Sequence, residues 1–232
     1  MSDHILLIIV IAVLILGAVK GYRKGFLRLA VWFAALVAAL FVVTRIAPHV
    51  SSFLIENTTL KEKIEEKIVE AYENKNASRL PDSTLPGDEG QNTAIDSLGL
   101  PALIADTLKS NNTSEIYNRL AVSLFREYIA GYLSTLSVKA GTFVGLLILL
   151  FLIEFILIMT IKLLEKIPVL RTFNRLLGMA AGITLSLVFI WIFFLAVMMF
   201  FGHSFGGWVF AQVGNSRFLT YLFNNNILFG LL

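Results

Sequence analysis

Four long apolar runs separated by charged stretches constrain this chain more than any other feature of its sequence. The runs cover residues 5–19, 29–43, 140–164 and 179–201, and the last contains no charged residue. A helix needs about 20 residues to cross the hydrocarbon core of a bilayer, because each residue advances it by about 1.5 Å. The sequence therefore predicts an all-α membrane protein with about four transmembrane helices.

The first two runs are short, with only 15 uninterrupted apolar residues each. Lys20 and Arg45 follow them, and both side chains are long enough to carry their charges to the membrane surface. Residues 1–45 are therefore predicted to form a transmembrane hairpin of helices 1 and 2. The alternative is a re-entrant hairpin, which enters and leaves the bilayer on one side.

The composition agrees with a membrane protein and argues against several other classes. Hydrophobic residues make up 57% of the chain and charged residues 15%, against about 45–50% and about 25% in soluble domains. The chain has no cysteine, which excludes disulfides and thiolate metal sites. His4, His49 and His203 lack ligand spacing, and no phosphate loop or nucleophile motif occurs. We therefore expect no metal, no cofactor, no catalytic residue and no enzymatic activity.

Basic residues gather in the two short loops that follow the first and third runs. These residues are Lys20, Arg23, Lys24, Arg28, Lys162, Lys166, Arg171 and Arg175. The positive-inside rule places both loops in the cytoplasm and therefore both termini outside it. The alternative role for these side chains is binding of anionic lipid head groups. Because they lie at the ends of apolar runs, they do not indicate a nucleic-acid partner.

Residues 46–137, between the second and third runs, are predicted to form an extracytoplasmic helical insert. Over residues 45–137 the chain has 9 basic and 13 acidic residues, which favours the outer side. Thr59 and Glu62 have capping-box spacing, and the residues after them place an apolar stripe on one helical face. The stripe consists of Leu60, Ile64, Ile68, Ala71 and Tyr72. Because this stripe needs a surface to cover, the insert is the expected binding site for an envelope protein partner.

The rest of the insert shows one break and two further helices. Residues 76–96 lose all periodicity and contain Pro81 and Pro86, so they are predicted to be a flexible linker. Helix signals resume at Pro101, and a longer amphipathic helix is expected over about 114–136. This longer helix is predicted to lead directly into the third crossing.

Residues 138–201 are predicted to hold transmembrane helices 3 and 4, and residues 202–232 an amphipathic aromatic tail. Ser216 is a predicted cap of a short helix that continues to Leu222. The aromatic side chains of the tail suit a membrane interface, where rings lie among the head groups. They are Trp208, Phe210, Phe218 and Tyr221.

Glycine pairs four residues apart occur in three of the apolar segments and predict close helix packing. They are Gly17, Gly21 and Gly25, then Gly141 and Gly145, then Gly178 and Gly182. Residues four apart share a helix face, and paired glycines let two backbones approach within lipid. Packing within one chain is the favoured interpretation, and a homo-oligomer is the alternative.

Glu154 is the one acidic residue inside the third apolar run. Because a charge in a bilayer is costly, such a residue usually faces the protein interior or a water-filled cavity. Two interpretations stay open. A protonated Glu154 donates a hydrogen bond to a neighbouring helix, or Glu154 forms part of a proton- or ion-linked site.

Two stretches carry the most specific motifs of the sequence: residues 3–28, which include Lys24, Gly25, Phe26 and Arg28, and residues 168–182, which lead into the last apolar run. They resemble the colicin V production protein (CvpA-type) family of bacterial inner-membrane proteins. In the first, Lys24, Gly25, Phe26 and Arg28 match the family pattern, while Leu29 stands where an acid is usual. The second covers residues 168–182, and the tail over 218–228 is similar to longer members of the family. In the second stretch, Asn174 stands where the family often has aspartate. The resemblance implies a four-crossing plasma-membrane protein linked to colicin V production and toxin biosynthesis.

Together these observations predict a non-enzymatic membrane protein that supports export or envelope maintenance. Its expected partners are the lipid bilayer, an envelope protein bound through residues 46–137, and a second copy of the chain if it oligomerises. The alternative is a small oligomeric channel or transporter that uses Glu154.

Overall fold

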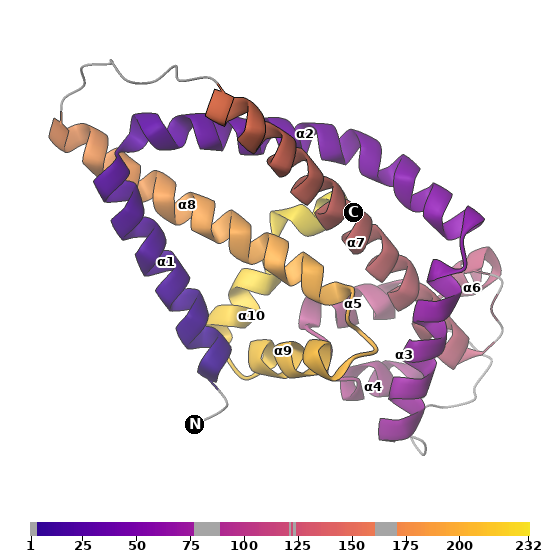
Figure 1. The fold of residues 1–232 in the computed structure, drawn as a ribbon. Coiled ribbons are helices and arrows are strands. Elements are labelled where there is room, and N and C mark those ends of the chain that lie inside the picture. Colours follow the sequence, from indigo (N-terminus) through magenta and orange to yellow (C-terminus); the bar gives the residue numbers. More distant parts are fainter. Residues whose placement is uncertain (1–3, 77–88, 121, 123, 161–170) are drawn as a thin grey trace.

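The computed structural model describes residues 4–76, 89–120, 122, 124–160 and 171–232, which form helices joined by short turns, with no strand among them (Figure 1). Four helices are long and apolar enough to cross a membrane, as the sequence predicts. They are α1 (Ile5–Lys24), α2 (Phe26–Asn57), α7 (Phe125–Thr160) and α8 (Arg171–Met198). The shorter elements are α3 (Leu60–Asn76), α4 (Glu89–Ser97), α5 (Ala102–Ser110), α6 (Ser114–Leu120), α9 (Ser204–Gly214), α10 (Arg217–Asn224) and the 3-10 helix η2 (Ile227–Leu231).

Helix α8 is the centre of the bundle, because it packs against the other three crossing helices. Helix α1 lies along α8, and α2 packs chiefly against α7. The two helices of the N-terminal hairpin touch each other little and diverge from their junction (Figure 1). The contacts of α1 with α8 and of α2 with α7 therefore join the N-terminal hairpin to the two later crossing helices.

A single residue, Gly25, forms the corner between α1 and α2. Its φ of 77° lies in the left-handed region, which a glycine adopts without a steric penalty. Its backbone N–H donates to the carbonyl oxygen of Gly21 at 2.9 Å, which closes the last turn of α1. The 20 residues of α1 span about 30 Å, enough for a full crossing.

Helix α2 extends well beyond the boundary predicted at residue 45 and ends at Asn57. Its 32 residues span about 48 Å, more than a bilayer core requires. Arg45 marks the end of the apolar run but not of the helix, which continues through Pro48. The end of the apolar run therefore indicates where α2 leaves the membrane. The helix itself continues beyond that point to Asn57.

The insert contains more helix than the sequence predicts. Residues 89–96, assigned to a flexible linker, form most of α4, while residues 77–88 of that linker lie outside the described residues. The buried side chains Gln91 and Ile95 anchor α4, and the amide of Asn112 donates to Gln91 Oε1 at 2.8 Å. This tertiary contact stabilises a segment whose own sequence shows no helical periodicity.

The helix expected over 114–136 is broken into α6 and the start of α7. Glu127 stands three residues into α7 and accepts a hydrogen bond from the backbone N–H of Leu124 at 3.2 Å. This is half of a capping box, and it begins a new helix at that point. From Phe125 the chain continues without a break into the third crossing, as predicted.

The C-terminal tail folds into α9, α10 and η2 and packs on the bundle. Ser216 Oγ accepts from the backbone N–H of Leu219 at 3.4 Å, which confirms the predicted cap of α10. Trp208, Phe218 and Tyr221 are exposed, but Phe210 is only 4% exposed. The placement of Phe210 at a membrane interface was therefore wrong, because its ring is buried next to that of Phe201.

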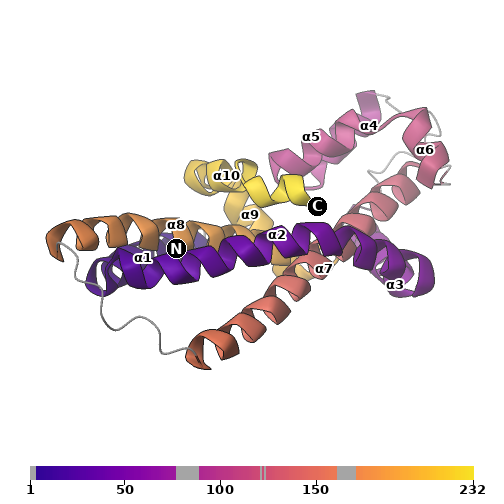
Figure 2. The ribbon, with the colours of Figure 1, turned by 90° about the horizontal axis from the view of Figure 1, so that it is seen from above.

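We refer to α3–α6 together with α9, α10 and η2 as the cap. Figure 1 shows the cap at the end of the bundle where α1 begins and α8 ends. The corner at Gly25 and the first turn of α8 lie at the opposite end. Figure 2 shows that α5 and α10 lie to one side of α2, while α3 continues from its far end.

Candidate functional site: the α1–α8 contact and the cap

A close backbone contact joins Gly17 and Gly21 of α1 to Gly178 and Gly182 of α8. A methyl group added at Gly21 would collide with the carbonyl oxygen of Gly178, and one added at Gly182 with that of Gly17. The obstacles are backbone atoms, which cannot rotate away as a side chain can. These four glycines therefore bring two backbones into direct contact within one chain.

The other three glycines of the predicted set lie in different surroundings. At Gly25 an added methyl would collide with the side-chain amide of Asn174, so this corner is packed against α8. At Gly141 it would lie 3.1 Å from the side chain of Met199. At Gly145 it would meet no atom within 4 Å. The spacing of the pairs is the same, but only those in α1 and α8 face each other.

A basic cluster surrounds the corner of α1 and α2. Lys20, Arg23 and Lys24 are exposed, and the guanidinium of Arg175 lies 5.7 Å from the centre of the Tyr22 ring. Ion pairs among the described residues join only Lys61 to Glu65 and Lys109 to Asp96, so no described acid neutralises this cluster. The side chains of the remaining predicted loop residues lie outside the described part of the chain: Arg28, Lys162, Lys166 and Arg171.

Glu154 lies near the same end of the bundle, on α7. Its side chain is half-buried, and its Oε2 atom is buried without a hydrogen-bond partner in the described structure. Phe151, one turn earlier on the same face, packs near the ring of Phe189 on α8. The neighbouring Phe155 lies near Trp32 of α2, with ring centres 6.1 Å apart, so this part of α7 lies beside both α8 and α2.

The apolar stripe of α3 is covered by the chain itself. Helix α3 packs against α7, and Ile68 is only 1% exposed. An added methyl at Gly202 would lie 2.9 Å from the carbonyl oxygen of Lys67, so the segment after α8 also touches α3. Leu60, at the start of the stripe, is 42% exposed. The stripe was expected to need a partner surface, and α7 provides most of that surface.

The tail is fastened to α5 and α8 by side chains that the sequence analysis did not select. Asn224 Oδ1 accepts from the backbone N–H of Leu103 at 3.3 Å, in the first turn of α5. Asn226 Nδ2 donates to the carbonyl oxygen of Trp191 at 3.1 Å. In return, the indole Nε1 of Trp191 donates to the carbonyl oxygen of Leu222 at 3.0 Å.

A further bond joins the tail to the first crossing helix. Gln212 Oε1, on α9, accepts from the backbone N–H of Leu6 at 3.4 Å, in the open first turn of α1. Such N–H groups have no partner within their own helix. The three polar links of the tail therefore reach α1, α5 and α8, which lie far apart in the sequence.

Where the cap meets the start of α7, tyrosine and amide side chains form a buried polar cluster. Tyr117 stacks on Tyr128 with ring centres 5.0 Å apart, and Tyr128 Oη donates to the carbonyl oxygen of Leu108 at 2.6 Å. Burial raises the pKa of Tyr117 to about 12, although the neighbouring Gln91 side chain lowers it. The stacked rings and the bond to Leu108 join α6 and α5 to the first turn of α7.

No group of three or more metal-ligating side chains occurs among the residues that the structure describes. The fold and the contacts above define a multi-pass α-helical membrane protein with a folded cap at one end. Residues 6–71 match a family model described as colicin V production protein, which confirms the resemblance in the first of the two stretches. Residues 168–182 and 218–228 lie outside the matched region. Neither the curated proteins nor the solved structures yield a match. The matched region contains α1, the Gly25 corner, α2 and most of α3.

Proposed function

We propose that this chain supports export or envelope maintenance from the plasma membrane by coupling a partner-binding cap to its crossing helices. The match to the colicin V production family supports a role in toxin production. The single observation that carries the coupling is the set of polar links from the tail to α1, α5 and α8. Because these hydrogen bonds fix the tail to α1, α5 and α8, we expect the cap and the crossing helices to move together.

In the proposed orientation, the cap lies outside the cytoplasm and the basic cluster at Gly25 lies inside. The basic cluster and the cap are at opposite ends of the bundle, which supports the positive-inside assignment (Figure 1). Both termini and residues 46–137 are then extracytoplasmic. The proposed role needs no enzymatic chemistry, because the contacts between the cap and the crossing helices would carry the effect of partner binding into the membrane region.

The partner surface that we favour is the polar outer face of α5 and α6, since most of the α3 stripe is occupied. Asp106 and Glu115 are exposed there and have no ion-pair partner among the described residues. An envelope protein with a basic surface fits these charges, and electrostatic complementarity of this kind mainly sets partner choice and association rate.

Photo-crosslinking in cells tests this proposal. A photoreactive residue at exposed Ser110 or Ser114, beside these acids, is expected to capture one envelope protein, whereas the same residue at exposed Phe189, on the membrane-facing side of α8, is not. Asp106→Lys combined with Glu115→Lys should remove both the crosslink and the export or envelope phenotype at unchanged protein level. Only intramolecular products, or a charge-reversed variant with full function, would contradict the proposal.

A second candidate function, a proton-linked channel, is favoured by one observation at Glu154. Its Oε2 atom is buried without a hydrogen-bond partner in the described structure. Gly145, exposed on α7 with nothing near it, offers a surface on which such bundles could associate. Glu154→Gln should then abolish proton flux into liposomes, whereas Glu56→Gln at an exposed position should not change it. Absence of flux in the parent protein excludes this candidate.

A further inference from the structure

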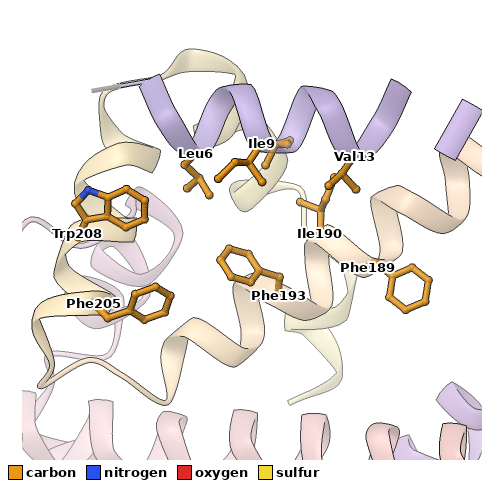
Figure 3. A pocket seen from close by; sticks show the side chains of 9 residues that line it. Leu6, Ile9, Val13, Phe189, Ile190, Phe193, Phe205 and Trp208 are labelled. Atoms are coloured by element: carbon orange, nitrogen blue, oxygen red, sulfur yellow. The ribbon is translucent and has the colours of Figure 1, made fainter. Parts of the chain in front are cut away.

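An apolar pocket of about 410 Å³ lies between α1, α8 and α9. Figure 3 shows Leu6, Ile9 and Val13 of α1 on one side, facing Ile190 and Phe193 of α8. Phe205 and Trp208 of α9 lie at one end of the pocket (Figure 3). The side chains that line it are all apolar apart from the indole N–H of Trp208.

The pocket has a buried floor and an open side. Leu6, Val10 and Ile190 are only 3–5% exposed, whereas Ile9 and Phe189 are 50% and 53% exposed. The open side continues into the outward surface of α1, where Ile8 is 63% exposed. Because α1 and α8 cross the membrane, this surface contacts lipid, and the pocket opens sideways into the hydrocarbon.

Its depth in the bilayer follows from its position along α1. The pocket runs from Leu6, in the first turn, to Val13, about 10 Å further along the helix axis. It therefore occupies the first third of a hydrocarbon core of about 30 Å, on the side of the cap. Trp208 lies at one end of the pocket, and an indole ring is well suited to the membrane interface.

Water is a poor occupant of this pocket, because a buried water needs two to four polar partners and the lining offers almost none. We propose that the pocket holds one acyl chain of a membrane phospholipid, from the leaflet on the side of the cap. The pocket and the lipid surface are continuous, so the chain enters sideways without leaving hydrocarbon. Its retention comes from packing against the buried floor, since transfer from lipid to protein gives no hydrophobic gain. This inference does not depend on the proposed export role.

Native mass spectrometry of the protein released from membranes in mild detergent tests this inference. The parent protein is expected to retain one phospholipid. Val10→Phe fills the pocket from the floor and Val13→Phe from its far end, so each should lower the retained fraction about tenfold. Ile15→Phe, on the outward face of α1 beyond the pocket, should retain lipid like the parent.

Equal retention by the parent and both filled variants would overturn the inference, and so would equal loss in the Ile15 control. If Val10→Phe lowers the melting temperature, Val13→Phe decides, because Val13 is only half-buried and tolerates a larger side chain. A second protein chain is the rival occupant. Because the native chain contains no cysteine, the single cysteine of Ile9→Cys can form a disulfide only with the same residue of a second chain. An efficient disulfide-linked dimer in the bilayer would assign the pocket to that second chain instead.

Discussion

Gly182→Ala is expected to destabilise the protein by about 1–3 kcal/mol, the usual cost of overpacking, and Gly182→Leu by more. The added methyl would collide with the carbonyl oxygen of Gly17 on α1. Since neither backbone can rotate out of the way, the two helices must separate along the largest helix contact in the bundle. The melting temperature in detergent, followed by tryptophan fluorescence, measures the effect.

Gly145→Ala is the matched control for this substitution. Gly145 also lies within a crossing helix, but an added methyl there meets no atom within 4 Å. Alanine favours a helix interior over glycine by about 0.5–1 kcal/mol, so this variant should be neutral or slightly more stable. Equal destabilisation by both substitutions would contradict the proposed contact, because it would show that glycine matters for some reason other than close approach.

Asn226→Ala is expected to cost about 1–3 kcal/mol and to loosen the tail, because it leaves buried backbone groups without partners. Asn226 is 5% exposed, and its amide both donates to the carbonyl oxygen of Trp191 and accepts from the backbone N–H of Leu228. Asn225 is exposed and donates only to Tyr221, one turn earlier in its own helix. Asn225→Ala should therefore change stability by less than about 0.5 kcal/mol.

Limited proteolysis and tryptophan fluorescence distinguish these two asparagine variants. In Asn226→Ala, cleavage within residues 217–232 should be faster, and the total tryptophan emission should shift as the surroundings of Trp191, one of three tryptophans, open. In Asn225→Ala, both should match the parent. If the two variants behave alike, the tail is not held to α8 by the side chain of Asn226, and the coupling between cap and spans loses its main support.

The sequence predicted those features that depend on neighbouring residues. The apolar runs predicted four crossings, and Ser216 predicted the cap of α10, because hydropathy and capping act within a few residues. The end of α2 at Asn57 was missed because the apolar run ends at Val43 while the helix continues. Phe210 was misplaced because an aromatic ring suits an interface and a buried core equally well.

Features that join distant parts of the chain could not be predicted in the same way. Glycine spacing indicated close packing, but not that Gly17 and Gly21 face Gly178 and Gly182 rather than another pair. Asn224 and Leu103, joined by a hydrogen bond, are 121 residues apart. Helix α4 forms where no periodicity is visible, because Gln91 and Ile95 find partners elsewhere in the cap. Such contacts depend on the tertiary structure, which a local pattern does not encode.

The proposed topology has four membrane crossings, with the cap outside the cytoplasm and the Gly25 corner inside. Because the native chain contains no cysteine, single cysteines at exposed Glu115, Asn215 and Arg23 test it directly with a membrane-impermeant maleimide on intact spheroplasts. Immediate labelling of Glu115→Cys and Asn215→Cys is expected, with labelling of Arg23→Cys only after the membrane is opened. Labelling of Arg23→Cys in intact spheroplasts, or opposite behaviour of the Glu115 and Asn215 variants, would contradict this topology.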